Sequence, residues 1–200
     1  SIRRNFPDSE IILSTWEGAP LLGLDYDILV LSKDPGSYCM GDDGVLLNIN
    51  RQITSTRNGL EIASRPYCVK VRSDLKFTSN KLLDLLSISK KLNLVGAGLI
   101  GGGRIIVTEL TTVNPRKYLQ MPFHFCDWLY AGSTETLRNL FDIDDCPEAA
   151  YASWFVHKKR PDNYALNFNS RYAAESYIIS TWYKRYFNLV FDHSYDFSNK

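Results

Sequence analysis

The stretch YCVKVRSDL, residues 67–75, is a hydrophobic strand pattern that ends in charged residues. Side chains alternate along a strand, so Lys70, Arg72 and Asp74 share one face and the valines share the other. Charges on an otherwise apolar strand need partners, because burying an unpaired charge costs free energy. Two interpretations stay open: an ion pair between Arg72 and Asp74, or a site where Asp74 holds a divalent cation beside cationic groups that meet a diphosphate.

Further patterns on both sides of this stretch alternate between strands and helices. Short apolar runs predict strands at residues 10–15, 26–32, 104–113 and 123–131. Apolar residues at helical spacing predict helices at residues 48–63, 80–92, 134–141 and 175–187. This alternation is typical of an α/β domain with a mostly parallel sheet. Ligands bind at the carboxyl ends of such strands, so residues 15–17, 33–36 and 72–74 should line one crevice.

The composition is that of an ordinary globular protein, and it excludes several classes. The chain has 200 residues, of which 44% are hydrophobic and 22% charged, so we expect one domain over residues 1–200. A net charge of +1 provides no chain-wide field for nucleic acid. We find no signal peptide, no apolar run of membrane-spanning length and no CxxC spacing. We therefore expect a cytoplasmic protein with reduced cysteines, no nucleic-acid partner and at most a peripheral contact with the inner face of the membrane.

The first turn of the helix expected at residues 48–63 has features that favour anion binding. Asn48 is a suitable N-cap, and Asn50 and Arg51 follow it in the first turn. Free N–H groups and the helix dipole attract anions there, and arginine adds a bidentate donor. The alternative for Arg51 is an exposed side chain at a solvated helix start.

Three other motifs have ordinary structural explanations. The run at residues 96–101 spells G-x-G-x-x-G, but a strand pattern follows it where a dinucleotide site needs a helix, so a loop fits better. His124 and Cys126 fit packing better than a nucleophile pair or a metal site. The basic run at residues 157–160 fits a solvated loop better than a contact with anionic lipid.

Two carboxylates keep both a functional and a structural interpretation. Asp127 lies between aromatic residues, where it is either a base or acceptor anchor, or a capped loop residue. Glu175 lies at the head of an aromatic helix, where it either favours the helix dipole or serves an active site. Sequence position alone leaves both interpretations open.

Several segments, taken in order, resemble the WavE lipopolysaccharide-synthesis family, within the wider set of GT-A-type glycosyltransferases. The residues that carry the resemblance are SIR and FP within residues 1–7, EIILSTWEG at 10–18, DPG at 34–36, NRQI at 50–53, YCVKVRSDLKF at 67–77, CDWLYAG at 126–132 and AESYI at 174–178. The ordered set is fairly specific, because these segments have no shared structural reason to occur together.

The resemblance implies a fold and a pair of substrates. The fold is a GT-A-like Rossmannoid mixed sheet flanked by helices, here lacking its first strand. The donor is a nucleotide-diphosphate sugar, and the acceptor is a surface glycan or glycolipid of lipopolysaccharide or capsule synthesis. Asp74 falls where such enzymes carry their metal-binding acidic motif, which implies Mn²⁺ or Mg²⁺. Arg72 replaces the first carboxylate of that motif, so this sequence supplies one carboxylate instead of two.

For such a sugar transfer we hypothesise roles for individual residues. Asp127 is the expected catalytic base and Glu175 the second candidate. Donor binding is assigned to the five residues that lie near the expected strand ends and helix start: Thr15, Trp16, Asn50, Arg51 and Arg72. The alternative is a non-catalytic glycan- or nucleotide-binding domain of the same fold.

Overall fold

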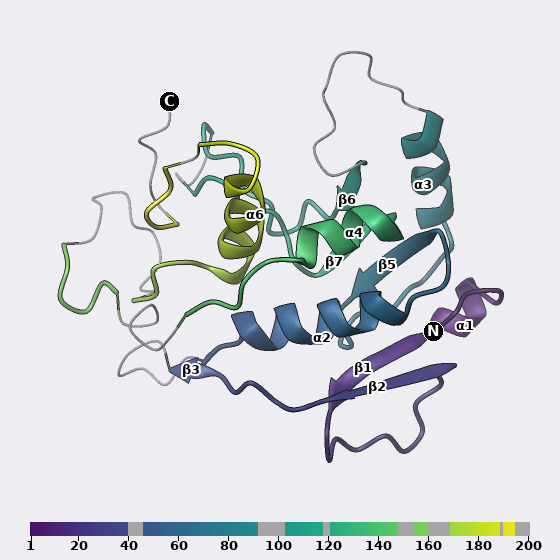
Figure 1. The fold of residues 1–200 in the computed structure, drawn as a ribbon. Coiled ribbons are helices and arrows are strands. Elements are labelled where there is room, and N and C mark those ends of the chain that lie inside the picture. Colours follow the sequence, from purple (N-terminus) through teal and green to yellow (C-terminus); the bar gives the residue numbers. More distant parts are fainter. Residues whose placement is uncertain are drawn as a thin grey trace. The chain divides into compact units, whose positions relative to one another are not determined.

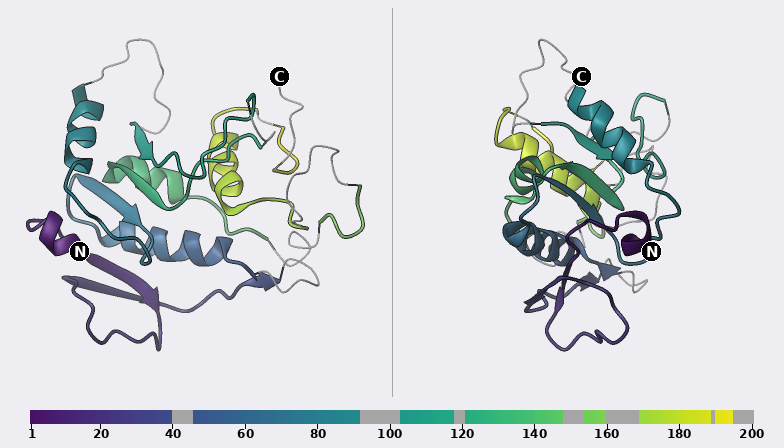
Figure 2. Two further views of the ribbon diagram at one scale, coloured as in Figure 1. Left: turned by 180° about the vertical axis from the view of Figure 1, so that it is seen from behind. Right: turned by 90° about the vertical axis from the view of Figure 1, so that its right-hand side faces the viewer.

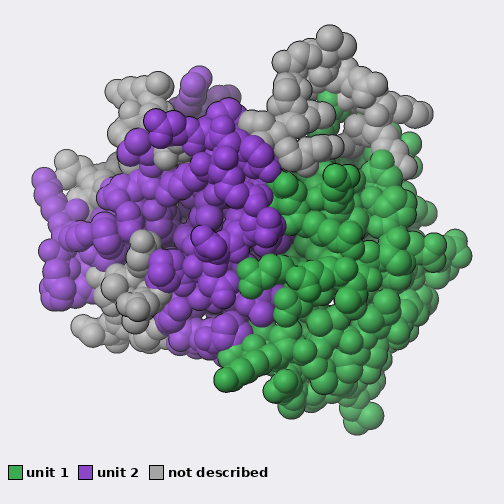
Figure 3. All heavy atoms as spheres, in the orientation of Figure 1, with its two compact units in different colours: residues 1–34, 55–107, 128–139 green, residues 35–54, 108–127, 140–200 purple. Residues whose placement is uncertain are grey.

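A computed structural model describes most of the chain. In this structure the chain divides into two compact units. The described residues are 1–39, 46–91, 103–117, 121–147, 154–159, 169–188 and 190–194. Unit 1 comprises residues 1–34, 55–107 and 128–139, and unit 2 comprises residues 35–54, 108–127 and 140–200 (Figure 3). Each unit is described by itself below.

The described elements mix helices and strands in a mixed α/β fold (Figure 1). The helices are α1 (Ile2–Asn5), α2 (Ile49–Ile62), α3 (Leu82–Lys91), α4 (Thr134–Phe141) and α6 (Ala174–Lys184). The strands are β1 (Ile12–Trp16), β2 (Ile28–Ser32), β3 (Tyr38–Cys39), β4 (Leu46–Leu47), β5 (Tyr67–Val71), β6 (Ile105–Val107) and β7 (Leu129–Ser133). The expected helices are confirmed to within a few residues at each end, while the short strands β3 and β4 were not foreseen.

In unit 1, strands β1 and β2 form a parallel pair, with Ile12 opposite Ile28 and Trp16 opposite Ser32. The carboxyl-terminal half of α2 packs on this pair. A Cβ added to Gly59 would lie only 3.2 Å from the Ser14 Cβ, so glycine allows the close approach of helix and strand.

The second sheet of unit 1 is antiparallel, with β7 between β5 and β6 (Figures 1 and 2). The expectation of a mostly parallel sheet is therefore wrong for the described residues, in which β1 and β2 form the one parallel ladder. The pairing depends on a close backbone approach, because a Cβ on Gly132 would lie 2.8 Å from the Arg104 carbonyl oxygen. Propensity along the chain predicts strands but not which strands pair or in which direction.

The strand expected at residues 123–131 begins later than its sequence pattern indicates. Phe123 has a φ of 60°, in the left-handed region that interrupts a strand, and β7 starts at Leu129. Residues 123–128 therefore form a loop. The strand expected at 104–113 is likewise confined to β6, and the glycine run at 96–101 lies outside the described residues.

Unit 2 is built around the buried face of α6. Tyr177, Ile178 and Trp182 are buried on this face, while Tyr186, beyond the end of the helix, is exposed. Aromatic rings extend the core: Phe123 packs against Phe191 with ring centroids 5.1 Å apart. None of the helices among the described residues is long and apolar enough to cross a membrane.

Candidate functional site

The charged strand end of unit 1 contains an ion pair. Strand β5 ends at Val71, and the next residue still bonds to β7, because the Arg72 amide donates to the Trp128 carbonyl at 3.1 Å. The Arg72 guanidinium then donates from Nε to Asp74 Oδ1 at 3.1 Å and from Nη2 to Asp74 Oδ2 at 2.7 Å. The hydrogen bonds from Arg72 lower the pKa of the Asp74 carboxyl, so the pair stays charged at neutral pH.

Cations and aromatic rings face each other across β5 and β7. Lys70 and Tyr130 are opposite one another in the ladder, and the Lys70 Nζ lies 5.5 Å from the centre of the Tyr130 ring. The Arg72 Cζ lies 5.5 Å from the centre of the Trp128 ring. Both distances fit cation–π contacts, which orient the two positive side chains at the sheet surface.

The described residues around Asp74 do not fit a protein-held divalent cation. Mn²⁺ or Mg²⁺ would take its first ligands from free carboxylate oxygens. Both Asp74 oxygens already accept hydrogen bonds from Arg72, and Lys70 adds a second positive charge nearby. Over the part of the chain that the structure describes, no group of three or more His, Cys, Asp or Glu side chains is placed to hold a metal ion.

The remaining donor-binding candidates lie in different elements. Thr15 and Trp16 are half-buried at the carboxyl end of β1, in the parallel pair of unit 1, whereas Arg72 follows the antiparallel sheet. Asn50 and Arg51 are in the first turn of α2, in unit 2. The Arg51 Nη1 donates to the Asn48 side-chain oxygen at 3.1 Å, a local contact at the helix start.

Asn50 is a buried clamp. Its Nδ2 donates to the Cys146 carbonyl at 2.9 Å and lies 3.1 Å from the Tyr38 hydroxyl, while its Oδ1 accepts from the Cys146 amide at 2.6 Å. Its donors and its acceptor are therefore used inside unit 2. Asn50 holds the segment around Cys146 in place, and this structure gives its side chain a positioning role.

Both predicted catalytic carboxylates lie beside one imidazole in unit 2. We call this set the His124 cluster: His124, Asp127, Glu175 and Gln52. Gln52 Nε2 donates to Asp127 Oδ2 at 2.6 Å, and His124 Nε2 lies 4.0 Å from Glu175 Oε1. Asp127 is buried, and the side chains of His124 and Glu175 are only 13% and 18% exposed. Two helix starts and one loop thus bring acid–base groups together.

His124 is neutral at physiological pH in this setting. Burial lowers the pKa of His124 below its ordinary 6.5, and the negative charge of Asp127 partly opposes that shift. Its Nδ1 is buried and, among the described residues, accepts or donates no hydrogen bond. The Nε2 side faces Glu175, which favours the tautomer with the proton on Nε2.

Sequence reasoning missed two members of the His124 cluster. The sequence pattern predicts a strand at His124, in which neighbouring side chains point to opposite faces, and so it favours packing for this residue. Gln52 carried one signal, its place in the NRQI segment, but its partner Asp127 is 75 positions away. Neither contact can be found from local spacing.

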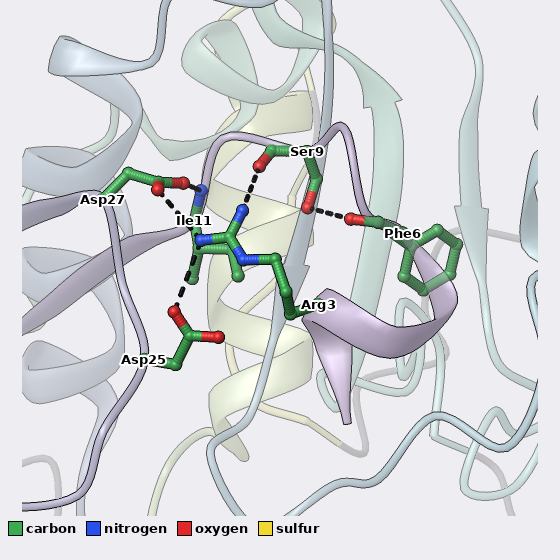
Figure 4. Close-up of polar contacts among 6 residues, drawn as sticks. All are labelled: Arg3, Phe6, Ser9, Ile11, Asp25 and Asp27. Carbon is green, nitrogen blue, oxygen red and sulfur yellow. Dashed lines mark hydrogen bonds and ion pairs between the residues drawn. The ribbon is translucent and has the colours of Figure 1, made fainter.

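A separate depression opens at the start of unit 1. Arg3 donates to Asp27 at 2.9 Å, to Asp25 at 3.4 Å and to the Ser9 carbonyl at 3.0 Å (Figure 4). This depression has a volume of about 290 Å³ and is lined by Arg3, Pro7, Asp8, Ser9, Glu10, Asp27 and Arg65. Three carboxylates outnumber two arginines in this lining, so the depression suits a diphosphate poorly.

One comparison with known proteins identifies a family. A family model described as WavE lipopolysaccharide synthesis matches residues 1–199. No curated protein and no solved structure matches the chain.

Proposed function

Because this chain belongs to the WavE lipopolysaccharide synthesis family, we propose that it is a glycosyltransferase of that pathway. Its donor is a nucleotide-diphosphate sugar, and its acceptor is a glycan or glycolipid of lipopolysaccharide or capsule synthesis. Building such a glycan requires new glycosidic bonds, and an activated donor supplies the free energy for each one. The lipid end of the acceptor places the reaction at the inner face of the membrane.

The observation that supports this reaction most is the His124 cluster. Sugar transfer needs a group that removes the proton of the acceptor hydroxyl, and carboxylates are common bases for that step. Asp127 and Glu175 are both buried or nearly so beside one neutral imidazole. A low-exposure site of this kind strengthens charge interactions and excludes bulk water.

Positive charge at the end of β5 is the proposed contact for the diphosphate of the donor. Lys70 and Arg72 are cations held over aromatic rings at the end of β5. Such preorganised charge stabilises the developing charge on a leaving diphosphate. Thr15, Trp16 and Arg51 are proposed as further donor contacts, while Asn50 acts through the segment that it clamps.

In the proposed step, the acceptor oxygen attacks the anomeric carbon of the donor sugar. The new bond joins that oxygen to the anomeric carbon, and the bond from the anomeric carbon to the phosphate oxygen breaks. The nucleoside diphosphate leaves with the electron pair, and the acceptor proton passes to Asp127, with Glu175 as the second candidate. In this arrangement His124 Nε2 lies 4.0 Å from Glu175 Oε1.

A divalent cation, when bound, would supply Lewis-acid stabilisation of the leaving diphosphate. Both oxygens of Asp74, the carboxylate expected to hold such an ion, are already bonded to Arg72, so the described residues there do not fit it. The proposed step therefore relies on the cationic side chains of the chain itself.

Release of nucleoside diphosphate from a panel of nucleotide sugars, with and without lipopolysaccharide acceptors, tests the proposal. We expect the release of nucleoside diphosphate to depend on the acceptor. Its rate should fall about 10²- to 10⁴-fold in the variant that lacks the catalytic base, which is either Asp127→Asn or Glu175→Gln. Asp144→Asn, which changes an exposed carboxylate of unit 2, is the matched control and should keep full activity.

Two results would contradict the assignment. Full activity in both carboxylate variants would remove the His124 cluster from the mechanism. Tight binding of a nucleotide sugar without release under any acceptor condition would instead favour a non-catalytic binding domain.

A further inference from the structure

We propose that Lys70, Arg72 and Trp128 form a diphosphate-binding site that needs no metal ion, and that Asp74 occupies the Arg72 guanidinium until the diphosphate replaces it. The identity of the ligand rests on the proposed function, whereas the binding site can be tested without any transfer reaction. Asp74 is then an internal competitor of the ligand and not a ligand of a metal ion.

The first support is the geometry of the Arg72–Asp74 pair. Two donors of one guanidinium, Nε and Nη2, bond to the two oxygens of one carboxylate at 3.1 and 2.7 Å. Arginine binds phosphate oxygens through the same parallel pair of donors. The Asp74 carboxylate therefore stands where a phosphate group would bind Arg72.

The second support is that Arg72 is held in position before any ligand arrives. Its amide bonds to the Trp128 carbonyl at 3.1 Å, and its guanidinium carbon lies 5.5 Å from the centre of the Trp128 ring. A side chain that is already ordered loses less conformational freedom when it binds, so less of the binding free energy is lost. The Trp128 ring, which is only partly buried, also offers a surface to the rest of a nucleotide sugar.

The third support is the balance of charge and exposure. Lys70 and Arg72 provide two positive charges, and Asp74 compensates one of them. The side chains of Arg72 and Asp74 are 44% and 61% exposed, and an ion pair so accessible to water is weak. Replacing a single carboxylate by a diphosphate, which carries more negative charge, is therefore favourable.

The proposed exchange of Asp74 for a diphosphate and the hypothesis that Asp74 holds a metal ion predict opposite effects of one substitution on diphosphate affinity. If Asp74 held a metal ion that binds the diphosphate, Asp74→Asn would weaken diphosphate binding. If Asp74 competes with the diphosphate, Asp74→Asn removes the competitor and should tighten binding by about two- to fivefold, the range expected for an exposed ion pair.

Calorimetric titration of the whole chain with inorganic pyrophosphate, in the presence of EDTA, measures this effect directly. We expect tighter binding for Asp74→Asn, weaker binding for Arg72→Gln, and no gain from Asp74→Asn when Arg72→Gln is also present. Asp84→Asn removes the same charge from an exposed position of α3 and serves as the matched control, with at most a small change expected.

Three results would overturn the exchange. They are weaker pyrophosphate binding in Asp74→Asn, a gain that persists in the double variant, and an equal gain in Asp84→Asn, which would reflect net charge alone. Absence of any glycosyl transfer would contradict the proposed function and leave these binding results unaffected, so the two failures can be told apart.

Discussion

Replacing Asn50 by alanine separates a structural role for this residue from the donor-binding role that its sequence context predicts. The Asn50 side chain bonds to both the amide and the carbonyl of Cys146 and lies within hydrogen-bonding distance of the Tyr38 hydroxyl. Cys146 is 1% exposed, so water cannot take over these bonds without opening the structure. We expect Asn50→Ala to destabilise the protein.

The size of the effect follows from the groups left behind. The Cys146 amide loses the partner at 2.6 Å, and a buried donor without a partner costs about 1–3 kcal/mol. The Cys146 carbonyl keeps the Tyr38 hydroxyl at 3.4 Å, so its loss is smaller, roughly 1 kcal/mol. Together the free energy of unfolding should fall by about 2–4 kcal/mol, a large share of the 5–15 kcal/mol of a typical protein.

Urea unfolding followed by fluorescence measures this difference, with Asn58→Ala as the matched control. Asn58 lies in the same helix and makes one bond, to the Ser32 hydroxyl at 2.8 Å, in a partly buried position. Loss of this hydrogen bond should lower the free energy of unfolding by about 0.5–1.5 kcal/mol, and the better helix propensity of alanine should offset part of that decrease. Equal stability of the two variants, with nucleotide-sugar binding lost only in Asn50→Ala, would refute the clamp and restore the donor-binding role.

Two further predictions concern single side chains. Burial lowers the pKa of His124 in the folded chain below the ordinary 6.5 that it has in the unfolded chain. At a pH between the folded and the unfolded pKa, the unfolded chain therefore binds more protons than the folded chain. The free energy of unfolding should consequently fall as the pH decreases from 7 to 5. His124→Gln should flatten this dependence in urea unfolding measured across that range, and an unchanged slope would argue against a buried neutral histidine. Arg138 donates to the carbonyls of Leu60, Glu61 and Ala63 at the end of α2, at 2.8, 3.1 and 2.9 Å. Arg138→Met should lower the free energy of unfolding by about 1–3 kcal/mol and speed amide hydrogen exchange in the last turn of α2. Unaltered hydrogen exchange in that turn would show that these hydrogen bonds add little stability.

Local patterns in the sequence predicted the elements well and their pairing poorly. The helix at α2 follows from apolar residues at helical spacing, and these are the residues that become buried, such as Ile49, Ile53 and Leu60. The start of β7 was misplaced because a left-handed phenylalanine at Phe123 leaves no signal in the sequence. The antiparallel pairing of β5 with β7 depends on contacts between distant residues, which no local pattern encodes.

In the candidate site, too, local features could be predicted from the sequence, whereas contacts between distant residues could not. The sequence offered two interpretations for Arg72 and Asp74, and the structure contains the ion pair. The partner of Asn50 is 96 positions away, so a buried clamp could not be distinguished from a helix start that binds anions. The sequence pattern predicts a strand around His124 and so favours packing for this residue, whereas its nearness to Glu175 depends on the folded chain.

We propose that this member of the WavE lipopolysaccharide synthesis family transfers sugar residues. Mass spectrometry of truncated lipopolysaccharide acceptors, incubated with the whole chain and a panel of nucleotide sugars, tests it most directly. We predict that an acceptor gains the mass of one sugar residue with one of these donors, and that the gain disappears when Asp127→Asn and Glu175→Gln are combined. An acceptor whose mass stays unchanged with every donor, or a gain that persists in the double variant, would contradict the account.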